Sequence, residues 1–286
     1  MIRFAESRDR EDVASIWREC FGDEGYYIDF FLNNLFKSER CLIYDYEGTP
    51  AAMLHLLPIN LIDQAATFKT QYIYAAATLP AFQRRGLMAK LIDFAVVYGI
   101  EKGFKFTSLL PANQSLYGYY EKCGFKSAFY IKRTILTRAQ LTAAAGNSKS
   151  AIIIPSDDKA IYSRRLDSFN SALLWDYEMF SYVLKEWRFT GGEIISFKNG
   201  YALCRKTDKG LLIKELCITD GSFAAFASVL LERFEADIFI FYLPQSSQLF
   251  ENTELLYYGM LRADNDNGVI VESVFKSKPY YNLMLD

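Results

Sequence analysis

The chain has 286 residues, a net charge of −2 and 51% hydrophobic residues, a profile typical of a soluble globular protein with one large or two ordinary domains. This near-neutral charge provides no overall field to attract nucleic acid or an anionic membrane, and we expect neither as a partner. No apolar run approaches the roughly 18 residues that span a bilayer, and charges interrupt the N-terminus too early for a signal peptide.

The five cysteines and the single histidine argue against disulfide and metal chemistry. The cysteines are odd in number and show no paired spacing, which favours a reducing cytoplasm and predicts no zinc site. His55 lies in the apolar stretch 51–59, and we interpret it as a hydrogen-bonded strand residue. One histidine without a ligand cluster also argues against a histidine-based metal centre and a Ser-His-Asp triad, and we expect no metal.

The first half of the chain alternates strands and helices in an order that predicts a mixed α/β sheet with helices on its faces. Apolar residues at helical spacing predict a helix over 10–21, which Gly22 ends, and a long helix over 86–102, which ends before Gly103. The other expected elements are helices at 26–36 and 114–122 and strands at 2–5, 41–46, 51–57, 70–78, 106–110 and 129–136.

A change of composition predicts a second domain. The segment 143–148 is rich in small and polar residues, so we place a linker at 139–150 between domains at 1–138 and 151–286. The second domain repeats the order of elements of the first, but not its sequence. Its expected elements are helices at 160–170, 176–188 and 223–234 and strands at 193–198, 201–205, 211–218, 238–243, 269–274 and 281–285.

The turn from Gln83 to Ala89 follows a predicted strand and opens a predicted helix. The first N–H groups of a helix have no partner within the helix, and the helix dipole adds positive charge there. A tight basic turn in front of them forms a nest for a diphosphate, and Gly86 lets the backbone approach it without a Cβ. By itself, this segment fits an ordinary basic turn equally well.

A second motif, 113–125, reads Asn-Gln-Ser-Leu-Tyr-Gly-Tyr-Tyr-Glu-Lys-Cys-Gly-Phe. Together the two motifs resemble the GCN5-related N-acetyltransferase (GNAT) superfamily, whose turn reads Gln/Arg-x-x-Gly-x-Gly/Ala and whose later motif reads Asn-x-x-Ala-x-x-Leu-Tyr-Glu-Lys-x-Gly-Phe. Met88 stands where Gly or Ala is usual, a departure shared with a subgroup resembling the enhanced-intracellular-survival acetyltransferases. The resemblance covers about residues 1–136.

The resemblance implies an acyl-CoA N-acyltransferase fold, here as two tandem GNAT-like domains without the sterol-carrier-like domain of that subgroup. It also implies acetyl-CoA as co-substrate. The backbone of 76–78, where the strand separates from its neighbour, is expected to bind the acetyl carbonyl and the pantetheine, and the backbone of 84–89 to bind the pyrophosphate. Asn113 is expected to contact the pantetheine or the separated strand. The residues expected to bind acetyl-CoA are Ala76, Ala77, Thr78, Gln83, Arg84, Arg85, Gly86, Leu87, Met88, Ala89, Asn113 and Tyr120.

Tyr120 is implied by the resemblance as the general acid that protonates the departing CoA thiolate. A phenol with a pKa near 10 is a competent donor to a thiolate with a pKa near 8.5 when both are held in a dry cleft. A packed aromatic ring under the sheet is the alternative interpretation, and Tyr117 and Tyr119 compete for the same role.

The general base and the acceptor contacts are less defined. Asp23 and Glu24 stand where members of the superfamily contact the acceptor, although a solvated turn explains them equally well. In the survival subgroup the terminal carboxylate points into the active site, so Asp286 is a second candidate base, and we expect that lengthening the C-terminus reduces turnover.

The turn 219–222 in the second half has no basic residue and carries an acidic one, so we expect that half to bind no CoA and to wall off the acceptor groove. These observations predict an N-acetyltransferase that uses acetyl-CoA and a small-molecule or peptide amine by direct transfer in a ternary complex. A non-catalytic acyl-CoA-binding module is the first alternative. A tandem-fold aminoacyl transferase that uses charged tRNA is the second.

Overall fold

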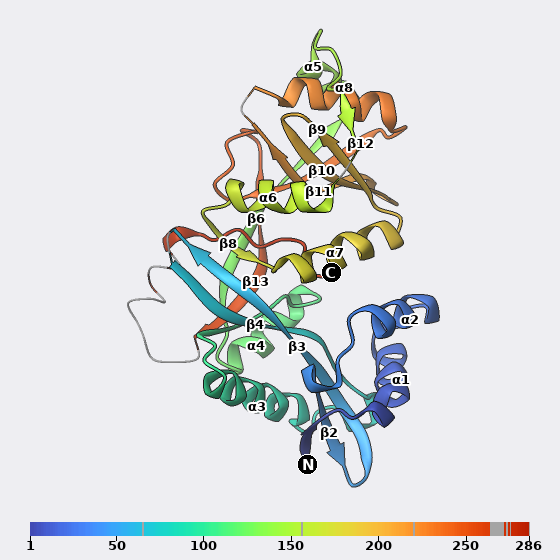
Figure 1. The fold of residues 1–286 in the computed structure, drawn as a ribbon, viewed down its shortest axis with the longest axis vertical. Coiled ribbons are helices and arrows are strands. Elements are labelled where there is room, and N and C mark those ends of the chain that lie inside the picture. Colours follow the sequence, from blue (N-terminus) through green and yellow to red (C-terminus); the bar gives the residue numbers. More distant parts are fainter. Residues whose placement is uncertain are drawn as a thin grey trace. The chain divides into compact units, whose positions relative to one another are not determined.

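The computed structural model describes residues 1–64, 66–155, 157–219, 221–263, 272, 274 and 276–285. The chain divides into two compact units, each built from separate stretches of the sequence (Figure 1). Unit 1 comprises 1–61, 66–128 and 259–275. Unit 2 comprises 62–65, 129–258 and 276–286.

Unit 1 is built on a mixed sheet with the strand order β1-β2-β3-β4-β5-β13. β4 and β5 run parallel, whereas β1 with β2, β2 with β3, and β5 with β13 are antiparallel. The bounds of these strands are β1 (Ile2–Phe4), β2 (Cys41–Tyr46), β3 (Thr49–Asp63), β4 (Ala66–Thr78), β5 (Phe106–Leu109) and β13 (Glu254–Ala263). Residues 62–63 of β3 and 254–258 of β13 are counted with unit 2.

Helices α1 (Arg10–Phe21) and α2 (Gly25–Asn34) lie on one side of these strands, and α3 (Leu87–Glu101) and α4 (Tyr117–Lys122) lie on the other (Figure 1). Burial of one apolar side of α3 and α4 against the sheet forms the core of this half of the unit. Among its described residues the unit also has the short 3-10 helices η1 (Ser7–Asp9), η2 (Ser38–Arg40), η3 (Pro80–Phe82) and η4 (Gln114–Leu116).

Unit 2 has the strand order β6-β12-β11-β10-β9-β7, in which only β11 and β12 are paired in parallel. Helices α5 and α8 lie on one side of the strands, and α6 and α7 lie on the other (Figure 1). Its strands are β6 (Lys126–Thr137), β7 (Ile153–Ile154), β8 (Ser171–Leu174), β9 (Glu193–Phe197), β10 (Gly200–Thr207), β11 (Gly210–Ile218) and β12 (Ile238–Pro244). Its helices are α5 (Arg138–Ala145), α6 (Asp158–Ser168), α7 (Tyr177–Phe189) and α8 (Phe223–Arg233).

The segment expected to be a linker begins as helix α5. A capping box joins Thr137 and Gln140 at its start, and Leu141 and Ala145 are buried in the core of unit 2. Composition was misleading here because alanine is small but is also the best helix former. The catalytic and degenerate domains at 1–138 and 151–286 stay predictions, since the structure divides the chain by compactness alone.

Most predicted elements are confirmed, and 10–21 agrees in both bounds. The strand expected at 281–285 is wrong: Leu283 and Leu285 have left-handed backbones (φ 58° and 60°), which interrupt an extended strand. The strand expected at 269–274 falls mostly outside the described residues. Strands β7, β8 and β13 were not predicted.

Candidate active site

Strand β4 changes direction just before the residues expected to bind the acetyl group. Its parallel ladder with β5 runs from Thr70 opposite Phe106 to Ile73 opposite Leu109, where β5 ends. Ala75 then adopts a left-handed backbone with φ 48°, which is uncommon for a residue other than glycine. The three residues 76–78 therefore continue β4 beyond its pairing with β5. A strand that extends beyond the end of its neighbour offers backbone N–H and C=O groups on that side to a ligand.

The turn after β4 has a backbone of alternating handedness. Arg84 has φ 62° and Gly86 has φ 73°, whereas Arg85 between them does not have a positive φ. Such alternation directs successive N–H groups to one concave side and forms an anion nest. Gln83 ties the turn to the strand, because its Nε2 donates to the carbonyl oxygen of Thr78 at 3.1 Å. All four residues of the turn, 83–86, are exposed.

Helix α3 begins directly behind this turn without a side-chain cap. Gly86 is the N-cap residue, and the N–H of Lys90 donates to its carbonyl at 3.2 Å. Gly86 has no side chain to cap the helix, and the N–H groups of 87–89, which have no partner within the helix, lie at the positive end of the helix dipole. Apart from its two neighbours in the chain, no described residue would come within 4 Å of a Cβ on Gly86, so the space at that position is open. This is the environment that a diphosphate requires.

Met88, the departure from the GNAT signature, packs its side chain against the core of unit 1. Leu87 is buried in the same core, whereas Ala89 is half-buried. The larger side chain at position 88 is therefore accommodated on the protein side of the helix. It does not fill the concave side of the turn.

Tyr120 lies on α4 and is 8% exposed, packed against Tyr119 and Phe125. Burial, with a smaller contribution from Cys123, raises the pKa of Tyr120 to about 12. The phenol is therefore fully protonated at neutral pH.

Of the two competing tyrosines, Tyr117 shares the surroundings of Tyr120 and Tyr119 does not. Tyr117 is buried in the same core, and Tyr119 is half-buried, where burial raises its pKa. Asn113 uses its side-chain oxygen locally: Oδ1 accepts from the backbone N–H of Ser115 at 3.1 Å and from its hydroxyl, and so caps η4. Its amide Nδ2 is the group left to donate to another partner.

Asp23 and Glu24 form the turn between α1 and α2 but are held differently. Trp17 Nε1 donates to Asp23 Oδ2 at 2.8 Å, which fixes the orientation of that carboxylate. Glu24 is exposed and serves α2 through its backbone, whose carbonyl accepts from Tyr27 and Ile28. Both carboxylates stay candidates for acceptor contacts.

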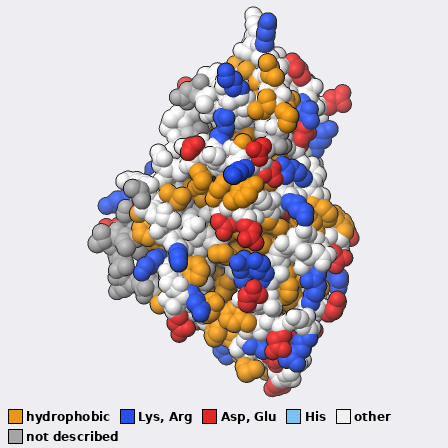
Figure 2. All heavy atoms as spheres, viewed as in Figure 1, with side chains coloured by type: hydrophobic (Ala, Val, Ile, Leu, Met, Phe, Trp, Pro, Cys, Tyr) orange, Lys and Arg blue, Asp and Glu red, His pale blue; other side chains and the backbone are white. Residues whose placement is uncertain are grey.

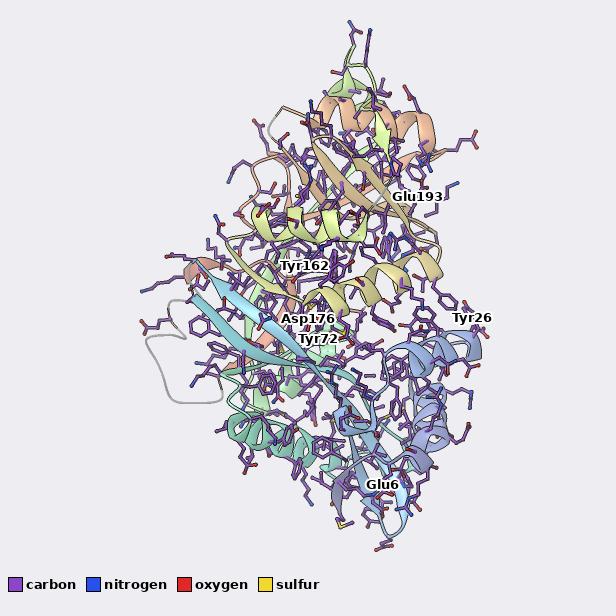
Figure 3. All side chains as sticks on the ribbon, viewed as in Figure 1. Glu6, Tyr26, Tyr72, Tyr162, Asp176 and Glu193 are labelled. Atoms are coloured by element: carbon purple, nitrogen blue, oxygen red, sulfur yellow. The ribbon has the colours of Figure 1, made fainter. Side chains whose placement is uncertain are left out.

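An aromatic cluster on the α1–α2 side of β4 was not predicted. Tyr72, labelled in Figure 3, lies on β4 and its ring stacks with that of Tyr74. The centroid of the Tyr74 ring lies 5.6 Å from that of Trp17. The hydroxyls of Tyr74 and Tyr27 lie 3.2 Å apart. Alternation of tyrosine at 72 and 74 was the available signal, because residues two apart on a strand point to one face. Tyr26 lies at the outer side of α2 and is 64% exposed (Figure 3).

His55 belongs to the same side of the sheet and is 1% exposed among aromatic rings. Its position in a strand is confirmed, but Nε2 has no hydrogen-bond partner among the described residues. Burial lowers its pKa to about 3. His55 therefore stays neutral at physiological pH and is too weak a base to take a proton from an ammonium.

The five cysteines are free thiols, and burial raises the pKa of each. A thiol with a raised pKa is a poor nucleophile because little thiolate is present. Cys20 lies beside the end of β4, since the backbone of Thr78 is within hydrogen-bonding reach of its sulfur.

The corresponding turn of unit 2 precedes α8. Asp220 lies outside the described residues, and on either side of it the hydroxyls of Thr219 and Ser222 lie 3.0 Å apart. The opposite face of that sheet holds a buried ion pair, Arg165 with Glu215 at 3.0 Å, and Tyr201 donates to the same carboxylate at 2.7 Å. The charge of Arg165 is paired with Glu215, and Tyr201 hydrogen-bonds the same carboxylate, as is expected of a buried ion pair with a structural role.

The candidate base Asp286 also lies outside the described residues. In the described part of the chain, no three His, Cys, Asp or Glu side chains are grouped to hold a metal ion. None of the helices described there is both long and apolar enough to cross a membrane. On the face in view in Figure 2, acidic and basic side chains are interspersed.

A mixed sheet in which β4 outruns its parallel neighbour and leads through a nest-like turn into an uncapped helix defines the fold class of the acyl-CoA N-acyltransferases. A family model described as an acetyltransferase (GNAT) domain matches residues 1–128. These residues therefore belong to the GNAT acetyltransferase family, and the protein is an acyltransferase. No curated protein matches the sequence.

Solved structures similar to the whole chain share its fold at low identity. A GCN5-related N-acetyltransferase from Kribbella flavida has a TM-score of 0.75 at 15% identity, covering 92% of this chain and 70% of that one. Eis1 from Mycobacterium abscessus has a TM-score of 0.73 at 13% identity, covering 94% and 75%. A conserved protein of unknown function from Enterococcus faecalis, a probable N-acyltransferase, has a TM-score of 0.75 at 12% identity, covering 93% and 72%.

Proposed function

We propose that the GNAT domain transfers an acetyl group from acetyl-CoA to an amine of an acceptor by direct transfer. The observation that carries the proposal is the turn 83–86. Its alternating handedness, its exposed arginines and the uncapped N-terminus of α3 form a nest for a diphosphate. A left-handed arginine costs roughly 1 kcal/mol, and such strain is retained mainly where function requires it.

The residues around the turn fit acetyl-CoA. The N–H groups of 84–89 would hold the pyrophosphate, and the open space at Gly86 allows close approach. The end of β4 beyond its ladder with β5, 76–78, would hold the pantetheine and the acetyl carbonyl, with Asn113 Nδ2 as a further donor. When bound, acetyl-CoA supplies the acetyl group and a thiolate as leaving group.

Tyr120 is proposed as the general acid. It holds its proton on the hydroxyl oxygen at every pH in the physiological range, since its pKa is about 12. In isolation, transfer from this phenol to a thiolate with a pKa near 8.5 is unfavourable by about 5 kcal/mol. Burial raises the pKa of a thiol as it raises that of the phenol, so a dry site narrows this gap. Before transfer, the hydroxyl serves as a hydrogen-bond donor to the developing charge.

The acceptor is proposed to be a cationic amine. Asp23, oriented by Trp17, and the exposed Glu24 offer negative charge at the α1–α2 turn. Direct transfer is favoured over an acyl-enzyme because burial keeps all five cysteine thiols protonated.

The test is binding followed by turnover. Acetyl-CoA at 100 times its dissociation constant is expected to stabilise the protein by about 2.7 kcal/mol, measured as a thermal shift. A thiol-release assay across amines, aminoglycosides and peptides then finds the acceptor. Absence of any thermal shift would overturn the proposal. Stabilisation without thiol release from any amine would favour a non-catalytic acyl-CoA-binding module.

A further inference from the structure

The two arginines of the turn have different surroundings. Arg84 is exposed, has a left-handed backbone, and its side chain contacts no partner among the described residues. Arg85 is also exposed, but its guanidinium Cζ lies 5.3 Å from the ring centroid of Tyr46 and 5.5 Å from that of Phe82. Its Nη2 also donates to the carbonyl of Ala81 at 3.2 Å.

The two rings are anchored to rigid parts of unit 1. Tyr46 ends strand β2 and Phe82 ends η3, and their centroids lie 5.5 Å apart. Both rings also pack against the core that includes Leu87 and Leu91 of helix α3. Arg85 therefore joins the middle of the turn to the β2–β3 hairpin, which is remote in sequence.

Holding Arg85 in place also helps to keep the backbone conformation of the residues before and after it. Arg84 and Gly86 both need a positive φ, and a flexible turn would lose this alternation because the left-handed state is unfavourable for arginine. Planar guanidinium groups stack on rings, whereas the ammonium of lysine does so less well. The stack thus holds Arg85 by its side chain, and the backbone N–H groups on either side stay directed to the concave face.

We infer that Arg85 is a positioning residue, which stacks on Tyr46 and Phe82 to hold the turn in its anion-binding shape, whereas Arg84 supplies the free cation. This assignment rests on the proposed function. It separates two adjacent arginines that the sequence makes equivalent.

The inference predicts different binding defects for the two arginines, measured by calorimetry with CoA at several salt concentrations on the full chain. Tyr46→Leu keeps both positive charges, and Arg85→Lys keeps the charge at position 85. Each is expected to weaken CoA binding about fivefold, since an exposed cation–π contact contributes roughly 1 kcal/mol. Their salt dependence should match that of the wild type. Arg84→Gln removes a charge and should flatten the salt dependence.

Tyr98→Leu is the matched control. Tyr98 stacks with Lys102 at 5.5 Å toward the other end of α3, so the variant removes a similar contact away from the turn. It is expected to bind CoA as the wild type does. Thermal unfolding of every variant identifies any that fail to fold. If Tyr46→Leu is among them, the comparison of Arg85→Lys with the wild type still tests the positioning role.

A second readout needs no ligand. Trypsin cleaves after Arg84 and Arg85, and mass spectrometry follows that cleavage separately from cleavage elsewhere. Tyr46→Leu is expected to speed cleavage at the turn several-fold, and Tyr98→Leu is not. If Tyr46→Leu changed neither CoA binding nor cleavage, the positioning role would be overturned. The variant Arg85→Gln removes the charge at position 85. If it flattened the salt dependence while Tyr46→Leu bound CoA normally, Arg85 would act by its charge, which would also overturn the positioning role. Failure of the wild type to bind CoA would instead overturn the proposed function itself.

Discussion

Burial acts on two residues of unit 1 in opposite chemical directions. It raises the pKa of Tyr120 to about 12 and lowers that of His55 to about 3, because in each case the charged form is disfavoured away from water. The tyrosine thereby keeps a proton to donate, and the histidine loses the ability to accept one. Two residue types that could each serve acid–base catalysis are thus separated by their surroundings.

Replacing Tyr120 by phenylalanine tests the general acid. The variant keeps the ring in the core and removes only the hydroxyl, so we expect kcat for thiol release to fall about 100-fold with little change in acetyl-CoA affinity. Steady-state kinetics and calorimetry measure the two effects. Tyr119→Phe, on the neighbouring half-buried ring, is the control and should stay within about threefold of the wild type. Equal losses in both variants would remove the special role of Tyr120.

His55 predicts a pH dependence of stability. Its pKa is about 3 in the folded protein and near 6.5 when unfolded, so the unfolded chain binds a proton first as the pH falls below about 6.5. Stability is therefore complete above pH 6.5 and is lost progressively towards pH 3. Between pH 7 and 5 the loss amounts to about 2 kcal/mol.

The variant His55→Phe isolates this effect, because the chain has no other histidine. It also removes a buried Nε2 that has no partner among the described residues, so stability at pH 7 should not fall greatly. Urea unfolding of both proteins between pH 7 and 5 measures the difference. Parallel curves for wild type and variant would show that His55 is not buried in its neutral form.

Helix α3 is bounded by glycines that share a left-handed backbone but differ in purpose. Gly86 precedes it with φ 73° and Gly103 follows it with φ 80°. At neither position would a Cβ come within 4 Å of a described residue other than the chain neighbours. The glycine after the helix satisfies a common helix ending. The glycine before it stands in the turn proposed to hold the pyrophosphate.

Comparing Gly86→Ala with Gly103→Ala separates strain from binding. Each variant places alanine in a left-handed conformation, which costs about 1 kcal/mol of stability. Only Gly86→Ala adds a methyl group in the space proposed for the ligand, so it alone is expected to weaken CoA binding by more than tenfold. Thermal unfolding and calorimetry provide the two measurements. Similar CoA affinity in both variants would place the pyrophosphate elsewhere.

At the scale of the whole molecule, each unit has a sheet with a pair of helices on either side. The turn before α3 carries two arginines, whereas the segment 219–222 before α8 carries none. In the second unit the face of the sheet beneath α6 is occupied by the buried pair of Arg165 with Glu215. Similar architecture thus comes with different chemistry in the two units.

This difference predicts one CoA per chain. Calorimetry should give a stoichiometry near one, and Arg84→Glu should reduce it to zero because the substitution reverses the charge at the nest. A second, weaker site that survives in Arg84→Glu would contradict the prediction. It would show that unit 2 also binds the nucleotide.

Local patterns determined much of this protein without its structure. Apolar spacing and the glycine after residue 21 define α1 to the residue, and the two motifs at 83–89 and 113–125 indicate the GNAT family. These features depend on residues close together in the chain, where helix periodicity and turn chemistry act directly. The composition of 139–150 did not reveal helix α5, because small residues are equally compatible with a helix, and Leu141 of α5 packs in the core of unit 2.

Only the tertiary structure shows that residues adjacent in the sequence have different surroundings. It distinguishes Arg85, stacked on Tyr46, from the free Arg84, although the two are adjacent and chemically identical. It also sets the left-handed Ala75 and the burial that keeps Tyr120 protonated. These properties arise from contacts between segments far apart in the sequence and from desolvation. No local pattern of residues encodes either.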